Sequence, residues 1–234
     1  MVSEDRPSLH RHALQLADGF VERITPSDLT RPTPCADWDL GQLLAHMIGQ
    51  HRGFAAATRD GTAPISAYAP VRFTLADWHR SVDELLAAFE AADLAESVIE
   101  VELHPTKPLP MPVIIGAQLL DTAVHTWDVA RSVDRTFTPD DELAEAVLKI
   151  AEPIPDDELR EAPGSAFGHA LPSTGSPWER ALALLGRDPH SRARPSSTAS
   201  QRTLMPWGDS PAETVATTST AASTCRQHQP SSPQ

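Results

Sequence analysis

Two ionisable residues four positions apart are the first feature of this sequence that could carry chemistry. Asp121 and His125 lie in a segment with helical apolar spacing. On a helix their side chains would share one face, about one turn apart. A carboxylate and an imidazole so placed can bind the same divalent cation. The spacing fits either a metal site or an ordinary hydrogen-bonded pair at a helix surface.

A third candidate ligand is His46, which belongs to a different predicted helix. It lies at one edge of that helix's apolar stripe, from which it can lean toward Asp121 and His125. Two imidazoles and one carboxylate would leave a bound ion with open positions. His51 competes with His46 because it lies nearer the centre of the stripe, where a buried core histidine is the alternative. Other helical histidines lie at polar positions and are expected at the surface, namely His10, His12 and His79.

Two further residues could assist such a site. Cys35 precedes the helix that carries His46, where the helix dipole favours a thiolate, and a small packed residue is the alternative. Asp128 follows His125 by three positions and can accept a hydrogen bond from its imidazole. A helix-packing Trp127 with a surface Asp128 is the alternative there.

Helical apolar periodicity predicts the elements that must position these residues. The predicted helices cover residues 9–24, 37–59, 75–89, 112–131, 140–150 and 177–186. N-caps, where a side-chain oxygen can accept a free backbone N–H, are predicted at Asp37, Thr74 and Ser176, and the stretch Thr138-Pro-Asp-Asp141 is predicted to cap the helix that ends at residue 150. Imperfect alternation over residues 97–103 fits a short strand. The four long helices need one another to bury their apolar faces, which predicts an all-α four-helix bundle with one or two short extra C-terminal helices.

The composition changes at the end of this helical part and limits the partners of the chain. Residues 191–234 are dominated by Ser, Thr, Pro, Ala and Gln, so we expect a folded domain over 1–190 and a disordered tail over 191–234. The net charge of -13 argues against nucleic acid as a partner. No segment approaches the roughly 20 apolar residues of a membrane span, and the first residues carry charges without an apolar leader. We therefore expect a cytoplasmic protein without membrane contact.

Three stretches of the sequence carry a resemblance to a known family. They are Thr33-Pro-Cys-Ala-Asp-Trp-Asp-Leu-Gly-Gln-Leu-Leu-Ala-His46, Asp121-Thr-Ala-Val-His125-Thr-Trp-Asp-Val-Ala-Arg131 and Ala-Leu-Leu-Gly-Arg-Asp-Pro189. The chain resembles, over about residues 8–189, the DinB-like metal-binding proteins related to the N-terminal domain of mycothiol-dependent maleylpyruvate isomerase.

The resemblance implies a fold, a metal and a cosubstrate. Those relatives are four-helix bundles in which a histidine on the second helix and an acid-xxx-His pair on a later helix bind a divalent metal. The corresponding residues here are His46, Asp121 and His125. Zinc is the metal expected first, with nickel or iron as alternatives. A low-molecular-weight thiol such as mycothiol is the implied cosubstrate.

Two departures from the isomerase limit what the resemblance implies. The isomerase has Glu where this chain has Asp121, and it has a separate C-terminal domain where this chain offers only short helices and a tail. We therefore expect a thiol-dependent transferase or isomerase that acts on some small molecule, rather than maleylpyruvate isomerisation itself. A non-catalytic, metal-stabilised binding or stress-response module is the alternative, and a homodimer is compatible with either.

Overall fold

The computed structural model describes residues 6–35, 38–161 and 165–190, and it confirms the all-α prediction over this part of the chain. Its α-helices are α1 (Arg6–Val21), α2 (Leu40–Asp60), α3 (Leu75–Ala91), α4 (Met111–Ser132), α5 (Asp141–Ala151) and α6 (Pro177–Leu184). Single 3-10 turns occur at Ile65–Tyr68 and Glu158–Glu161, and two short strands at β1 (Ser97–Val98) and β2 (Leu109–Pro110). The tail predicted over 191–234 lies outside the described residues.

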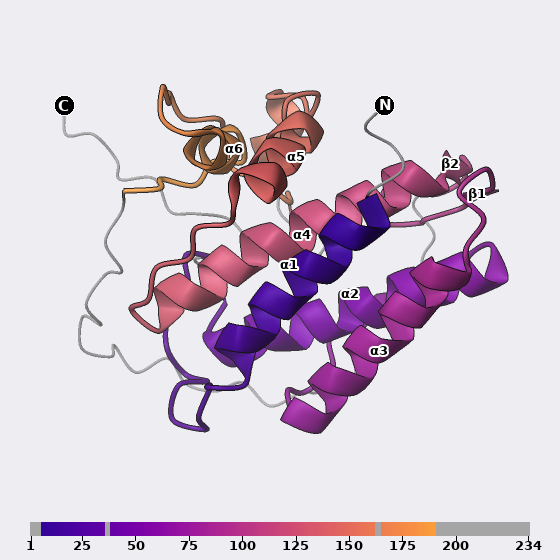
Figure 1. Cartoon of the computed structure of the whole chain (residues 1–234), viewed down its shortest axis with the longest axis horizontal. Coiled ribbons are helices and arrows are strands. Elements are labelled where there is room, and N and C mark those ends of the chain that lie inside the picture. The colour runs from indigo at the N-terminus through magenta and orange to yellow at the C-terminus, as the bar shows by residue number, and fades with distance from the viewer. Residues whose placement is uncertain (1–5, 36–37, 162–164, 191–234) are drawn as a thin grey trace, which may run out of the picture.

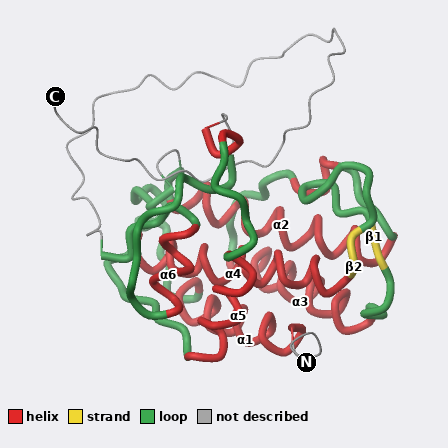
Figure 2. The backbone as a smooth tube through the Cα atoms, turned by 90° about the horizontal axis from the view of Figure 1, so that it is seen from above, coloured by secondary structure: helices red, strands yellow, loops and turns green. Residues whose placement is uncertain are grey.

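The long helices α1 to α4 form the predicted bundle, and the two short helices cover one side of it. In Figure 1, α1 lies along α4 while α2 and α3 form a second pair. Helices α5 and α6 pack on each other, and α5 also contacts α4. Seen from above, α5 lies near the middle of the bundle and α6 toward the end away from β1 and β2 (Figure 2).

Helix α4 is the central element, because it is buried on two faces. Ile114 and Ile115 belong to the core cluster shared with α2 and α3. Leu119 and Trp127 belong to a second cluster, which α4 shares with α5 and α6. The sequence pattern predicted one apolar face on each long helix, and for α4 this prediction was wrong. A helix that is apolar nearly all round is covered from several sides, which explains why the C-terminal helices pack on it.

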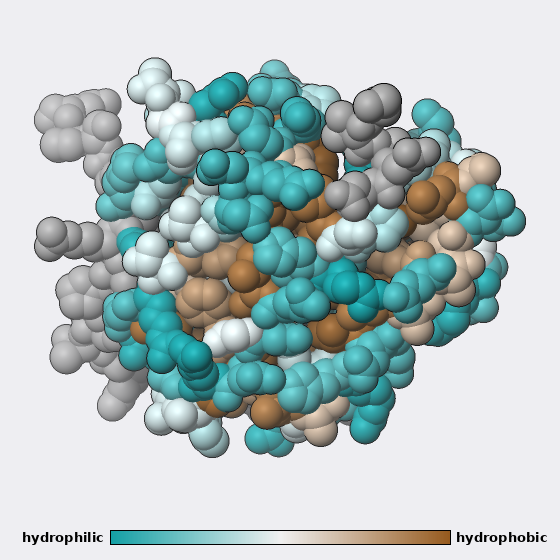
Figure 3. All heavy atoms as spheres, viewed as in Figure 1, coloured by the Kyte–Doolittle hydropathy of each residue, from teal (hydrophilic) through white to brown (hydrophobic). Residues whose placement is uncertain are grey.

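The outer surface is more polar than these two cores. Figure 3 shows a largely hydrophilic face, with hydrophobic residues gathered toward its middle. None of the helices in the described parts of the chain has the length and apolar character of a bilayer-spanning helix.

Helix α2, which carries His46, begins at a capping box. The Asp39 carboxylate accepts the backbone N–H of Gln42 at 2.8 Å, and the Gln42 side chain accepts the N–H of Asp39 at 2.9 Å. Asp39 is therefore the N-cap, and the cap predicted at Asp37 was wrong, although Asp37 itself lies outside the described residues. The caps predicted at Thr74 and Ser176 are confirmed, and within the capping stretch of residues 138–141 the N-cap is Asp140.

The strand predicted over residues 97–103 is shorter than expected. Only Ser97–Val98 pairs, with Leu109–Pro110. The chain then turns, because the backbone carbonyl of Glu100 accepts the N–H groups of Leu103 and His104 at 3.1 and 2.8 Å. This turn brings the Glu100 carboxylate inward, where it is fully buried.

Close packing fixes the loop after α2 against that helix. A Cβ atom at Gly49 would lie 2.5 Å from the backbone oxygen of Tyr68 and 2.7 Å from that of Ala69. These are backbone atoms, which cannot move aside as a flexible side chain would. Glycine at this position therefore allows the Ile65–Tyr68 turn to pack directly on α2.

We predict that Gly49→Ala lowers the free energy of unfolding by about 1–3 kcal/mol, since the added methyl forces the loop away from α2. Gly19→Ala in α1 is the matched control, because a Cβ there meets nothing within 4 Å. The control should raise stability by up to about 1 kcal/mol through reduced unfolded-state entropy. Urea unfolding followed by circular dichroism measures both, and equal effects of the two substitutions would contradict the packing.

Candidate metal centre

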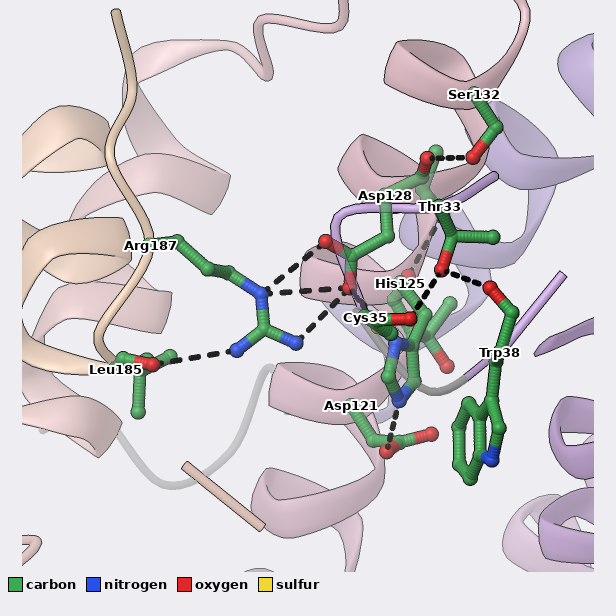
Figure 4. Close-up of polar contacts among 11 residues, drawn as sticks. Thr33, Cys35, Trp38, Asp121, His125, Asp128, Ser132, Leu185 and Arg187 are labelled. Carbon is green, nitrogen blue, oxygen red and sulfur yellow. Dashed lines mark hydrogen bonds and ion pairs between the residues drawn. The ribbon is translucent and has the colours of Figure 1, made fainter. Parts of the chain in front are cut away.

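The three residues predicted as metal ligands lie together between α2 and α4. His46, Asp121 and His125 each offer one ligand atom, and these atoms lie within 4.8 Å of one another. The Nε2 atom of His125 is 3.3 Å from Oδ1 of Asp121. The rings of His46 and His125 are nearly perpendicular, with centroids 5.3 Å apart. Figure 4 shows the Asp121 carboxylate and the His125 ring facing each other along α4.

The site lies at the edge of the bundle interior. His46 and His125 are each only 6% exposed, whereas the Asp121 side chain is 27% exposed. The indole ring of Trp38 packs beside both imidazoles, with centroid distances of 4.7 Å to His46 and 6.4 Å to His125. The cluster is therefore enclosed by protein on most sides and approached by solvent at Asp121.

The Oδ2 atom of Asp121 tests whether the cluster suits a cation. It is buried and has no hydrogen-bond partner among the described residues. Buried polar atoms are nearly always satisfied by protein, water or an ion. A carboxylate oxygen only accepts, so its partner must be a donor or a cation. With two imidazoles next to it, the donor set is the mixture of nitrogen and oxygen that divalent zinc, nickel and iron accept.

The three residues have different protonation states at neutral pH, because their surroundings shift their pKa values differently. Burial lowers the pKa of His46 to about 4, which leaves this imidazole neutral and able to bind a metal. Burial alone would raise the pKa of Asp121, but the adjacent His125 outweighs it and holds that pKa at about 2. Burial alone would also lower the pKa of His125, but Asp121 and Asp128 raise it to about 9. Without a metal His125 therefore carries a proton at neutral pH, which a bound cation would replace.

Behind His125 lies the buried carboxylate of Asp128. Its Oδ2 atom is 3.0 Å from Nδ1 of His125 and 2.9 Å from Nη2 of Arg187 (Figure 4). The structure thus favours the supporting role considered for Asp128 over the surface alternative. Cys35 is fully buried, and its Sγ atom lies 3.3 Å from the same Oδ2 atom. Cys35, His125 and Asp128 form a second group whose ligand atoms lie within 4.8 Å of one another.

A pair of buried or partly buried acidic residues, Glu100 and Glu102, was missed in the sequence. Gln50, one turn along α2 from His46, donates its amide N–H to Glu102 at 2.9 Å. Burial, together with the negative charges of Glu100 and Asp121, raises the pKa of Glu102 to about 7. The available signal was the imperfect alternation of residues 97–103, which contains both Glu100 and Glu102.

The competing histidine, His51, is separate from the three-residue cluster. Its Nδ1 atom lies 3.0 Å from Oγ of Ser81, and its ring packs on Trp78. His51 is thus the core histidine that the sequence analysis considered. His10 was expected at the surface, which was wrong. It is fully buried, with its ring 5.1 Å from that of Phe89, because α1 packs against α3 as well as α4.

The fold and the residue cluster together indicate the class of protein, and a comparison of sequences gives its family. A DinB-like helical bundle with a His/Asp/His cluster between its second and fourth helices accounts for both the fold and the site. The sequence model of the mycothiol maleylpyruvate isomerase N-terminal domain matches residues 10–130, and the chain belongs to this family. The resemblance stated from the sequence is thereby confirmed.

Comparisons with individual proteins add relatives but no activity. Two uncharacterized proteins of Mycobacterium tuberculosis, from strains CDC 1551 / Oshkosh and ATCC 25618 / H37Rv, are each 27% identical to this chain over 188 residues. Each match covers 76% of this chain and 95% of the relative. No solved structure matches the chain significantly.

We predict that His10 makes the protein sensitive to acid. Burial, with a smaller effect of His51, lowers the pKa of His10 from 6.5 to about 3. Below pH 6.5 the unfolded chain binds a proton at this residue that the folded chain does not. The stability is therefore fully present above pH 6.5 and lost as the pH falls toward 3, by about 2 kcal/mol between pH 7 and pH 5.

His10→Leu should remove this part of the pH dependence. The measurement is urea unfolding of both proteins at pH 7 and pH 5, with the difference between the two pH values compared. His12→Leu is the control, since His12 is exposed and pairs with Asp140 at the surface. Equal losses of stability in wild type and His10→Leu would contradict a neutral, buried His10.

Proposed function

We propose that this protein binds one divalent metal ion through His46, Asp121 and His125. We propose further that it uses the metal, with a low-molecular-weight thiol such as mycothiol, to transfer or isomerise a small molecule. The observation that carries the proposal is the convergence of two imidazoles and one carboxylate, with the Oδ2 atom of Asp121 buried and unpartnered among the described residues. Membership of a mycothiol-related isomerase family supports the thiol.

Different residues of the chain would have different roles at such a metal site. Three protein ligands leave at least one position open on zinc, the metal we expect first, with nickel or iron as alternatives. A metal in this position can lower the pKa of a thiol or water and polarise a carbonyl group. His46 is already neutral, and Asp128 fixes the ring of His125. Trp38 shields the two imidazoles from water.

Glu102 is the residue that we assign to proton transfer. Its pKa of about 7 lets it accept and release a proton near neutral pH. Gln50 anchors its carboxylate one helical turn from His46. The cytoplasm, where low-molecular-weight thiols are kept reduced, is the compartment that we propose for this chemistry.

The alternative is a module in which the metal only stabilises the bundle. The low exposure of both histidines favours it, since a sequestered ion needs no approach for substrate. The two functions differ in whether an external thiol reaches the metal.

We predict about one zinc ion per chain in wild-type protein that has been chelated and then reloaded. His46→Ala and His125→Ala should each lose the stoichiometric metal, because each removes one of three ligands. His79→Ala is the matched control, since His79 is exposed and lies near Glu22, away from the cluster. Elemental analysis measures all four proteins. Metal retained in both ligand variants, or absent from wild type, would sink the metal site.

We predict that a thiol binds directly to the metal. Protein loaded with cobalt(II) in place of zinc should gain a sulfur-to-metal charge-transfer band in the near ultraviolet when mycothiol or a smaller thiol analogue is added. The S-methylated thiol is the control, since it cannot supply a thiolate. An unchanged spectrum at saturating thiol would favour the non-catalytic module.

A further inference from the structure

Arg187 is a charged residue that the structure places deep in the protein, where it contacts a carboxylate that is far away along the chain. It follows α6, yet it is only 2% exposed. Its Nη2 atom lies 2.9 Å from Oδ2 of Asp128, and its Nε atom lies 3.3 Å from each of the two carboxylate oxygens. The two residues are 59 positions apart. Figure 4 shows the guanidinium group reaching across from the C-terminal segment to the carboxylate on α4.

The same carboxylate orients one of the candidate metal ligands. Asp128 Oδ2 also contacts Nδ1 of His125 at 3.0 Å. Because an ionised carboxylate only accepts hydrogen bonds, Nδ1 carries the proton. The other ring nitrogen, Nε2, is left facing Asp121 at 3.3 Å. Arg187, Asp128 and His125 thus form a chain of contacts that ends at the candidate metal position.

The way in which α6 ends directs the Arg187 side chain toward Asp128. The Arg187 N–H bonds to the carbonyl of Leu182 at 2.9 Å, and the Gly186 N–H bonds to that of Ala183 at 3.0 Å, which is a Schellman cap. Gly186 has the positive φ of 75° that this cap requires. A Cβ atom at Gly186 would also lie 2.7 Å from the backbone of Gly168. The direction of Arg187 is therefore set by how α6 ends and packs.

We propose that Arg187 is a positioning residue for the metal centre, through which docking of the C-terminal helices and metal binding stabilise each other. The inference rests on the proposed metal site. Residues that hold a metal-binding histidine commonly change metal affinity by about 10–100-fold when they are replaced. Coupling between two events is reciprocal, so the metal stabilises the docked α6 by the same factor that docking strengthens metal binding.

A buried ion pair that only stabilises the fold would have different consequences. Removing such a pair would lower stability but leave the folded site with its normal affinity and ligand geometry. Readouts of the metal itself, taken under conditions where every variant is folded, separate the two roles.

The first experiment compares Arg187→Met, Arg187→Lys and Arg180→Met with wild type. Arg180 is the control, because it lies on α6 and makes a surface ion pair with Glu152. Zinc affinity is measured by competition with a chromophoric chelator, and the visible cobalt(II) spectrum reports the ligand geometry.

Arg187→Met should bind zinc about 10–100-fold more weakly and shift the cobalt bands. Arg187→Lys should recover part of the affinity, since it keeps the charge but not the forked geometry. Arg180→Met should match wild type. A folded Arg187→Met with wild-type affinity and an unchanged cobalt spectrum would overturn the inference while leaving the metal site in place. A wild type without metal would remove the proposed function and this inference with it.

A second experiment needs no variant that might fail to fold. Zinc added to wild-type protein should slow amide hydrogen exchange in α6, although α6 contributes none of the three ligands. The effect should disappear in His125→Ala, which is expected to lose the metal and therefore controls for zinc bound elsewhere. Exchange in α6 that is the same with and without bound zinc would show that docking and metal binding are independent.

Discussion

The carboxylate of Asp128 lies in the interior of the bundle with none of its surface exposed, and the arrangement around the site depends on compensating that charge. A buried, unpaired carboxylate is costly, so its oxygens must be matched by donors. Arg187 and His125 supply them from two different parts of the chain. The position of the C-terminal segment and the orientation of the His125 ring are therefore two results of one electrostatic requirement. His125 in turn brings Asp121, a second carboxylate, into the same network.

The burial of α4 on two faces gives this network its architectural setting. One face completes the core with α2 and α3, and the other forms a second core with α5 and α6. Asp121, His125 and Asp128 lie on this central helix, so neighbours on both sides can reach them. His46 approaches from α2 and Arg187 from the end of α6. The short C-terminal helices therefore do more than cover α4, because Arg187, which follows α6, contacts the carboxylate of Asp128 beside His125.

What could be predicted from the sequence depended on how local its physical cause is. The pair Asp121 and His125 was found because helical spacing alone puts both side chains on one face. The caps at Thr74 and Ser176 were found for the same reason, whereas the cap of α2 was placed at Asp37 and lies at Asp39. Arg187 had no local signal, since its partner lies 59 positions away.

The residues that were misplaced or missed have different causes. His10 lies at helical spacing with Ala13, Leu14, Ala17 and Val21, which are all buried, so it belongs to the buried face of α1. It was assigned to the surface because a histidine was counted as polar, whereas Phe89 of α3 covers it. Glu102 was missed because the turn at Glu100, which directs both acids inward, replaces a strand. A cation at the Asp121 cluster would act on these acids as well. Its positive charge would counter the negative neighbours that raise the pKa of Glu102, and so favour the ionised form of that carboxylate. The metal and Glu102 would then belong to one electrostatic unit, in which a bound cation lowers the pKa of Glu102 from its value of about 7.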